Sequence, residues 1–424
     1  MSKYVPIGEI CYVYDGPHAT PIKTKSGPIY LGIDAVTDGG RLNPAEFSYL
    51  SESDYKIWTK RVTPQCDDIV FSYEATLGRY AMIPEGFYGC LGRRLAIVRA
   101  KDSRVNPRWL YYYFLSPEWS AFIANHTVKG STVNRISVED YPNYPIPLPE
   151  RKTQDAVVEV LSTIDQKIDN NTNLCVELES MAKTLYDYWF TQFDFPDENG
   201  KPYRSSGGEM VWNEQLKREI PKGWGVRPLS HVISSINTGL NPRDNFVLGN
   251  GDIQYLTVKN LTTSGTIDFS GCDTVDEHAR EIIHKRSDIS VGDILFASIA
   301  PLGRCYLIQT PPEKWDINES VFSIRRNASR VTSEYLYMYF MSDTFIKGAT
   351  SSSTGSIFKG IRINTLLDIA AVVPPKDIVY AFTTQVKPLL ALKEQKDTEN
   401  RELTKLRDWL LPMLMNGQAT VTDD

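Results

Sequence analysis

The chain contains two copies of one sequence unit. Residues 71–79, FSYEATLGR, return as residues 296–304, FASIAPLGR, and the starting residue numbers differ by 225. The same offset relates residues 130–131, both times Gly-Ser, to residues 355–356. One offset that persists over most of the chain indicates a duplicated unit. A duplicated chain has approximate two-fold symmetry, and the most common large ligand with matching symmetry is duplex DNA.

The composition is that of a globular protein with room for two or three domains. The 424 residues are 42% hydrophobic and 23% charged, and each copy is long enough to bury its own core. Because no run of about 18 apolar residues occurs, we expect no membrane span. The N-terminus lacks the apolar core of an export signal, so we expect a cytoplasmic location.

Charge and metal-binding residues narrow the function classes. The net charge of −6 counts against a protein that coats DNA nonspecifically, because phosphate contacts supply most nonspecific affinity. The net charge is compatible with local basic patches. It also indicates that other subunits supply part of the electrostatic attraction to DNA. The six cysteines form no C-x-x-C pair and the five histidines no H-E-x-x-H pair. We therefore expect neither a metal site nor a disulfide framework.

Each copy begins with a segment of short strands, residues 1–149 in the first and 224–375 in the second. Runs of β-branched and aromatic residues, divided by Gly, Pro and Asn, predict a twisted, largely antiparallel sheet. These runs are residues 29–33, 68–72, 95–98, 253–257, 293–297 and 320–324.

An aromatic run occurs in each of these segments, at residues 109–115 and 335–341. So many aromatic side chains suit a platform on which bases stack. Their helical spacing favours the other interpretation, a helix packed against the sheet.

A long helix is predicted after each sheet segment, over residues 150–190 and 376–416. Apolar residues recur in alternating steps of four and three, which is the pattern of a coiled-coil seam. Asn171 falls on the seam. A buried Asn at such a position fixes the register of the two helices, and the alternative is a seam that is locally open to water. Pro388 and Pro412 predict a kink or a frayed end. The predicted seam and subunit-docking residues are Leu161, Ile164, Ile168, Leu178 and Leu185, with Val386, Leu389, Leu403, Leu406 and Leu410.

These segments define the predicted architecture. Helices of about 40 residues are about 60 Å long, and a two-fold axis makes them antiparallel when they pair. Residues 191–223 form a linker that is Gly-, Ser- and Pro-rich in residues 193–208, where we expect a loop, and residues 417–424 form a tail. The predicted fold is α+β: two pseudo-two-fold-related mixed α/β domains separated by two long antiparallel coiled-coil helices.

Sequence motifs of catalysis are absent. The chain has no G-x-x-x-x-G-K-[ST] loop for ATP and no G-x-G-x-x-G after a strand for a dinucleotide or adenosylmethionine. It also lacks the Asn/Asp-Pro-Pro-aromatic run of amino-methyltransferases. We therefore expect a non-catalytic chain.

Two repeated polar segments are the candidate binding residues. The first is the Leu-Gly-Arg turn at residues 77–79 and 302–304, where Gly permits a tight backbone and Arg offers a forked donor to guanine or phosphate. The alternative is a hairpin turn with a surface Arg.

The second is the polar loop at residues 129–135 and 354–362, whose amides, hydroxyls and cations suit a phosphate clamp or base contacts. A solvated loop is the alternative. The copies differ here, Asn134 against Lys359 and Thr132 against Ile357, which predicts recognition of two different half-sites. The predicted DNA-contacting residues are Tyr73, Thr76, Gly78, Arg79, Lys129, Ser131, Thr132, Asn134, Arg135, Ser298, Gly303, Arg304, Thr354, Ser356, Lys359 and Arg362.

With these features in order, the chain resembles the specificity (S) subunits of type I restriction–modification systems over nearly its whole length. The resemblance rests on the two-copy layout, the Leu-Gly-Arg turns and the Gly-Ser loops. It also rests on the Pro-rich segments at residues 146–149 and 372–375, on the long helix after each, and on the joining stretch 200–224.

The resemblance implies two target-recognition domains, residues 1–149 and 224–375, each reading one half of a bipartite, asymmetric sequence in double-stranded DNA. It implies that the helices set the unread spacer and dock two methylation (M) subunits, in a prokaryotic cytoplasm. Adenosylmethionine, ATP and Mg would then be bound by partner subunits, with restriction (R) subunits in the full complex, and this chain would bind no cofactor.

Two other functions stay open at this point. One is specificity for a methylation-only or phage-defence complex without cleavage, which neighbouring genes would distinguish. The other is a coiled-coil scaffold with no DNA role, in which alanine at Arg79, Arg135 and Arg304 leaves the function of the complex intact.

Overall fold

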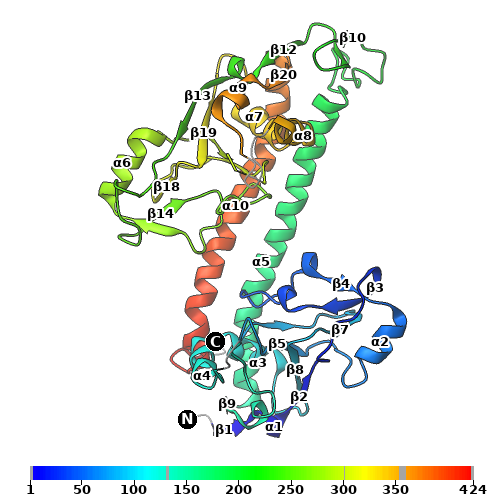
Figure 1. The fold of residues 1–424 in the computed structure, drawn as a ribbon, viewed down its shortest axis with the longest axis vertical. Coiled ribbons are helices and arrows are strands. Elements are labelled where there is room, and N and C mark those ends of the chain that lie inside the picture. The colour runs from blue at the N-terminus through cyan, green and yellow to red at the C-terminus, as the bar shows by residue number, and fades with distance from the viewer. Residues whose placement is uncertain (1–2, 130–132, 300, 353–359, 422–424) are drawn as a thin grey trace. The chain divides into compact units, whose positions relative to one another are not determined.

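The computed structural model describes residues 3–129, 133–299, 301–352 and 360–421 (Figure 1). The chain forms two compact units. Unit 1 is Met1–Ile168 with Glu402–Asp424, and unit 2 is Asp169–Arg401. Each unit therefore combines one sheet domain with a part of each long helix.

Unit 1 contains three small sheets. A four-stranded antiparallel sheet has the order β2-β8-β5-β6, and a three-stranded sheet has the order β4-β3-β7, in which β3 and β7 are parallel. A third sheet pairs β1 with β9. The strands are β1 (Lys3–Pro6), β2 (Cys11–Asp15), β3 (Thr24–Leu31), β4 (Ser48–Tyr49), β5 (Ile69–Ser72), β6 (Tyr80–Met82), β7 (Gly89–Leu91), β8 (Leu95–Ala100) and β9 (Pro145–Leu148).

Unit 2 repeats this topology. Its sheets have the orders β13-β19-β16-β17, β15-β14-β18 and β12-β20, again with one parallel pair, β14 and β18. The duplication in the sequence is thus a duplication of the fold. The strands are β12 (Gly225–Pro228), β13 (Ile233–Thr238), β14 (Ile253–Leu256), β15 (Asp273–Val275), β16 (Ile294–Ala297), β17 (Cys305–Leu307), β18 (Trp315–Ile317), β19 (Val321–Arg326) and β20 (Ala370–Val373).

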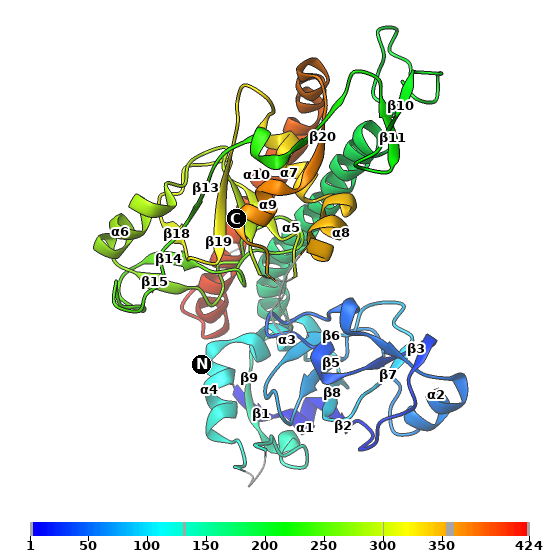
Figure 2. The same cartoon turned by 45° about the horizontal axis from the view of Figure 1, so that its top comes forward.

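Short helices cover these sheets. Unit 1 has α1 (Ile7–Ile10), α2 (Glu52–Trp58), α3 (Pro107–Leu115) and α4 (Pro117–Asn125), and unit 2 has α6 (Glu277–Ser287), α7 (Ser333–Phe340), α8 (Asp343–Ser352) and α9 (Ile363–Asp368). Asn106 and Thr332 cap the backbone N–H groups that begin α3 and α7. In Figure 2, α3 lies beside the sheet of β5, β6 and β8.

The aromatic runs are core residues. Trp109, Tyr113 and Phe114 of α3 are buried in one cluster with Phe71 and Val98 of the sheet. The equivalent helix α7 buries its aromatic side chains in the core of unit 2. Core packing, the favoured interpretation, is therefore confirmed. A stacking platform would require these rings to be exposed.

A buried ion pair recurs in the two sheet domains. Asp68 accepts hydrogen bonds from Nε and Nη2 of Arg99, both at 2.7 Å. Asp293 accepts from Nε and Nη2 of Arg325, both at 2.8 Å. Each carboxylate also accepts from a backbone N–H three residues earlier in the chain. Fork-shaped pairs of this kind hold strand ends in fixed geometry.

The long helices are α5 (Arg151–Tyr186), which continues as a π-helical turn over Asp187–Thr191, and α10 (Lys376–Met415). Helix α10 runs without interruption through Pro388 and ends three residues after Pro412, so neither proline ends it.

Within each unit the two helices pack in opposite directions. In unit 1, Leu161 near the start of α5 shares a core with Leu411 and Leu414 at the end of α10. In unit 2, Ala182 near the end of α5 shares a core with Phe382 near the start of α10.

The seam contains an amide pair. Asn171 is buried, and its Nδ2 donates to Oδ1 of Asn400 at 3.0 Å. The Nδ2 of Asn400 donates in turn to the hydroxyl of Thr172 at 3.1 Å. The seam prediction was wrong for Leu406, which is 43% exposed. The next residue, Arg407, faces Asp165 of α5 instead.

The linker is more ordered than the predicted loop. It forms turns around buried Phe193 and Phe195, and Phe195 stacks between Tyr203 and Trp224. Asp194 accepts hydrogen bonds from the backbone and the hydroxyl of Ser205. A hairpin of β10 (Met210–Asn213) and β11 (Arg218–Pro221) follows. Aromatic side chains spaced between the Gly and Pro residues supply this local core.

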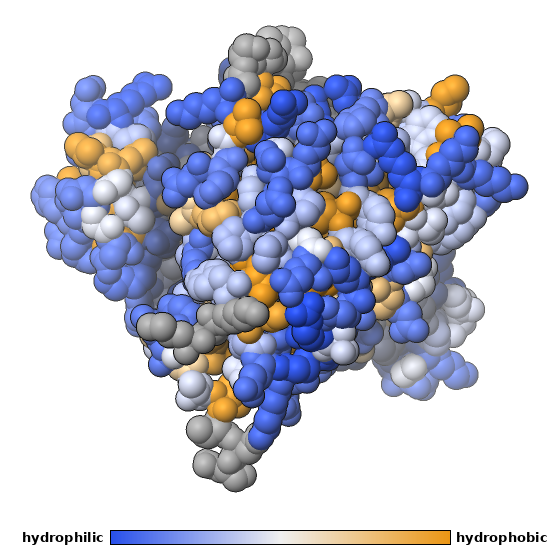
Figure 3. All heavy atoms as spheres, turned by 90° about the horizontal axis from the view of Figure 1, so that it is seen from below, coloured by the Kyte–Doolittle hydropathy of each residue, from blue (hydrophilic) through white to orange (hydrophobic). Residues whose placement is uncertain are grey.

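One face of the molecule is mainly polar. Figure 3 shows hydrophilic residues over most of this face, with small hydrophobic patches among them. Within the described part of the chain, no helix is long and apolar enough to cross a membrane. The same residues contain no cluster of three or more His, Cys, Asp or Glu side chains suited to a metal ion.

We predict that Asp68→Ala lowers the free energy of unfolding by about 2–3 kcal/mol, because it removes a charge-assisted hydrogen-bond partner of Arg99. Urea unfolding followed by tryptophan fluorescence measures the change. Asp38→Ala, which removes a carboxylate that is 81% exposed, is the control. Equal stability of the two variants would contradict the prediction.

Candidate nucleic-acid interface

The Leu-Gly-Arg turn of unit 1 connects β5 to β6 by a tightly bonded backbone. Gly78 has a φ of +73°, which a glycine adopts without strain. Its N–H donates to the carbonyl of Ser72 at 3.1 Å. The Ser72 hydroxyl accepts from the N–H of Arg79 at 3.1 Å and donates to the carbonyl of Thr76.

The polar loop folds back onto this turn. Val128 and Arg135 exchange backbone hydrogen bonds of 2.9 and 3.0 Å, and Ile136 N–H donates to the carbonyl of Tyr73 at 2.8 Å. Glu74 forms a bridge with Arg135. Two motifs about 50 residues apart in the sequence are thus brought together. Ser131 and Thr132 lie outside the described residues.

The turn and the loop border an open groove of about 360 Å³. Its lining includes Leu77 and Gly78 of the turn, Trp119 and Ile123 of α4, and Lys129 and Asn134 of the loop. Lys129 and Asn134 are exposed. A cation and an amide on one groove suit contacts to phosphate and to base edges.

Three predicted contact residues of the turn are not free at the surface. Tyr73 is buried in the core of unit 1. Its hydroxyl and that of Thr76 are buried and have no hydrogen-bond partner among the residues that the structure describes. Arg79 forms a two-pronged ion pair with Asp38, with N–O distances of 2.7 and 2.9 Å. The interpretation of Arg79 as a free forked donor was therefore wrong, because Asp38 approaches it from a distant segment.

Unit 2 holds the equivalent turn in the same way. Ile361 N–H donates to the carbonyl of Ser298 at 2.9 Å, and Ile299 forms a bridge with Gly360. Both contacts correspond to those of unit 1 at the offset of 225. Gly303 has a φ of +91° and lines a groove of about 170 Å³ with Leu302 of the turn and Ile346 of α8.

The remaining predicted residues of unit 2 have different surroundings. Ser298 is buried and donates to the carbonyl of Ser320 at 2.7 Å. Arg304, the residue after Gly303, is half-buried, and Arg362 is exposed at the start of α9. Thr354, Ser356 and Lys359 lie outside the described residues.

A neighbouring segment was not identified from the sequence. Tyr73 N–H donates to the carbonyl of Arg94 at 3.1 Å, and the Arg94 guanidinium lies 3.6 Å from Glu74. Exposed Arg93 precedes it. In unit 2 the same backbone bond joins Ser298 to Ser320, at 3.2 Å.

This segment reverses its charge between the copies. Gly92 donates to Leu31 and Asn318 donates to Leu256, both at 2.8 Å, which makes Arg93 and Glu319 equivalent. Both side chains are exposed. A position-by-position comparison of the two copies could have found this difference. The offset here is 226 instead of 225, however, so a comparison at 225 does not align Arg93 with Glu319.

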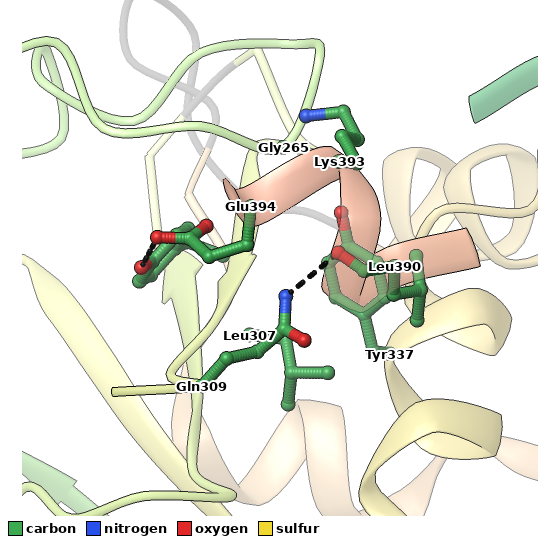
Figure 4. Close-up of a pocket in the computed structure, with 8 residues that line it drawn as sticks. Gly265, Leu307, Gln309, Tyr337, Leu390, Lys393 and Glu394 are labelled. Carbon is green, nitrogen blue, oxygen red and sulfur yellow. Dashed lines mark hydrogen bonds between the residues drawn. The ribbon is translucent and has the colours of Figure 1, made fainter. Parts of the chain in front are cut away.

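A second cavity, between the sheet domain of unit 2 and α10, is structural. Its volume of about 10 Å³ has room for about one water molecule. Figure 4 shows Gln309 donating to the carbonyl of Leu390, at 3.2 Å, and Glu394 accepting a hydrogen bond. The donor is the Tyr306 hydroxyl, at 2.9 Å. These contacts attach the sheet domain to the helix.

Comparisons with known proteins agree on one family. Residues 5–180 match the type I restriction modification DNA specificity domain. The chain is 25% identical over 386 residues to the MjaIX specificity subunit of Methanocaldococcus jannaschii, covering 89% of this chain and 85% of that protein. The HindI specificity subunit of Haemophilus influenzae is 21% identical over 397 residues, covering 80% and 84%. The chain is thus similar, over most of its length, to the specificity subunits of type I restriction–modification systems.

A solved structure shares the fold. The S subunit from M. genitalium aligns over 100% of this chain and 96% of its own, with a TM-score of 0.58 and 16% identity. The α+β fold with a long helix after each sheet domain is therefore that of a solved specificity subunit. The described candidate residues lie on the turn of each unit and on the segments that are hydrogen-bonded to it.

We predict that Tyr73→Phe keeps or raises stability, by up to about 1 kcal/mol, because a buried hydroxyl without a partner is destabilising. Thermal unfolding measures the change, and Tyr80→Phe is the control. The Tyr80 hydroxyl accepts from Trp119 Nε1 at 2.7 Å, so its loss lowers stability. A marked loss of stability in Tyr73→Phe would show that its hydroxyl has a partner.

Proposed function

We propose that each sheet domain of this specificity subunit reads one half of a bipartite, asymmetric sequence in double-stranded DNA. The proposal rests on one observation: the same turn recurs in the two units with the same backbone contacts and with different polar side chains around it. A common frame gives both domains the same approach to DNA, and different side chains select different bases. Arg93 against Glu319 is a reversal of charge between two exposed side chains.

The chemistry of the exchanged pair supports this assignment. An Arg side chain donates two hydrogen bonds to guanine, whereas a Glu side chain accepts from the amino group of cytosine. The Arg93 and Glu319 side chains make no ion pair within the described parts of the chain. Both are therefore open to an outside ligand.

We further propose that the long helices set the spacer between the half-sites and dock two methylation subunits. Helices of 36 and 40 residues, at about 1.5 Å per residue, are long enough to separate two major-groove contacts. In this proposal the chain is non-catalytic. Adenosylmethionine, ATP and Mg are bound by the methylation and restriction subunits.

An exposed apolar pair on α10 is a candidate contact for such a subunit. Leu406 and Trp409 are three residues apart on one helical face and are 43% and 58% exposed. Exposed aromatic side chains of this kind are typical anchors of protein interfaces.

The proposed function is tested by expressing the chain with its methylation subunit and sequencing the methylated adenines of the host genome. We expect one motif of two unlike half-sites separated by a fixed unread spacer. Methylation without a bipartite motif, or none above background, would contradict the proposal.

We predict that Arg93→Ala alters or relaxes the first half-site alone, and that Glu319→Ala alters the second half-site alone. Loss of one base contact costs about 1–3 kcal/mol of discrimination. The methylated motif of each variant is the measurement. A change in both half-sites, or in neither, would be inconsistent with base reading at these positions.

We predict that Trp409→Ser weakens association with the methylation subunit by about tenfold or more, as expected for an interface aromatic worth about 2 kcal/mol. Size-exclusion chromatography and titration calorimetry measure the association. Exposed Trp212 of the linker hairpin provides the matched control, Trp212→Ser. An equal loss in the two variants would place the interface elsewhere.

A further inference from the structure

The two Leu-Gly-Arg turns have the same backbone and different electrostatics. In unit 1 the guanidinium of Arg79 has two hydrogen-bond acceptors, a carboxylate and a backbone carbonyl. It donates to both carboxylate oxygens of Asp38, at 2.7 and 2.9 Å, and to the carbonyl of Val36 at 3.4 Å. Its charge is therefore neutralised within the protein.

Arg304 is the equivalent residue in unit 2. Within the part of the chain that the structure describes, its guanidinium makes one hydrogen bond, from Nε to the carbonyl of Pro301 at 3.3 Å. Among the described residues, no carboxylate lies within 4.0 Å of its guanidinium. The undescribed residues of this unit, 300 and 353–359, include no Asp or Glu.

A single difference between the copies, Asp38 against Thr263, explains why Arg79 has a carboxylate partner and Arg304 has none among the described residues. The segment that carries Asp38 folds in the same way in unit 2. Val36 bridges Leu42 in unit 1 and Leu261 bridges Ile267 in unit 2, both pairs at the offset of 225. The residue equivalent to Asp38 is then Thr263, which lines the same groove as Gly303. A neutral hydroxyl has replaced the carboxylate.

Arg304 is a half-buried cation that has lost part of its hydration and has no ion-pair partner among the described residues to compensate for that loss. Burial lowers the pKa of the Arg304 guanidinium, and no charged neighbour offsets that effect. Asp187 and Asp343 also line the groove but make no ion pair with Arg304. A planar guanidinium with free N–H groups binds a phosphate in two-pronged geometry.

We propose that Arg304 binds a backbone phosphate of the DNA half-site read by unit 2, whereas Asp38 withholds Arg79 from DNA in unit 1. The inference rests on the proposed function and adds an asymmetry to it: one turn is a phosphate contact and the other is an internal structural pair. The missing carboxylate at Thr263 defines which turn binds.

The test uses the assembled complex of the full chain and its methylation subunits with a fluorescent duplex that carries the bipartite target. Affinity is measured at several salt concentrations. The logarithm of the affinity falls linearly with the logarithm of the salt concentration. Removal of one phosphate contact reduces the magnitude of this slope by about 0.9. We expect this change in Arg304→Ala, with affinity reduced about tenfold at low salt.

The exchange at Asp38 and Thr263 supplies matched variants. Thr263→Asp rebuilds the clamp in unit 2 and is expected to reproduce the effect of Arg304→Ala without removing the arginine. Asp38→Thr removes the carboxylate that pairs with Arg79. It is expected to increase the magnitude of the slope by about 0.9, because Arg79 can then contact a phosphate. Arg304→Lys keeps the charge and is expected to keep the slope.

The outcomes separate this inference from the proposed function. If wild type binds a bipartite target but Arg304→Ala and Thr263→Asp keep its slope, the inference is wrong and the function stands. A changed methylated motif in Arg304→Ala would overturn the phosphate assignment in favour of base reading. If wild type binds no bipartite target, the proposed function itself fails. Thermal unfolding of each variant verifies that it is folded.

Discussion

The attachment of each sheet domain to the long helices depends on a helical carboxylate that accepts a tyrosine hydroxyl. In unit 1, Asp165 of α5 accepts from Tyr112 of α3 at 2.6 Å and from Arg407 of α10 at 3.0 Å. One side chain thus joins the sheet domain to both helices. In unit 2, Glu394 of α10 accepts from the buried Tyr306 at 2.9 Å. Burial and the nearby carboxylate raise the pKa of each tyrosine, which keeps the hydroxyl protonated as a donor.

This attachment matters because the reading residues lie on turns and loops that the sheets hold in place. The buried pairs Asp68–Arg99 and Asp293–Arg325 hold the strands in the same way in both units. The frame is therefore common to the two copies, whereas the exposed residues differ at Arg93 and Glu319, and at Asp38 and Thr263. A duplicated frame with unlike polar residues suits one DNA molecule with two unlike half-sites.

The sequence predicted the repeat, the strand runs, the aromatic helices and the long helices, because these depend on periodic burial that local patterns record. It also placed Asn171 on the seam, and the structure pairs it with Asn400. It was wrong for Leu406 and for Arg79, whose surroundings depend on Asp165 and Asp38, residues far away in the chain. Tyr73 was predicted as a contact residue from its place in the motif, but the core of unit 1 buries it.

The sequence by itself determined that one unit occurs twice, with a glycine turn, a polar loop and a long helix in each copy. Repetition and periodicity are properties of the chain alone. Only the tertiary structure decided which polar groups are free to bind. A guanidinium that is paired with Asp38 and one that has no carboxylate partner among the described residues follow the same Leu-Gly motif. Their difference arises from the segment that folds against each turn.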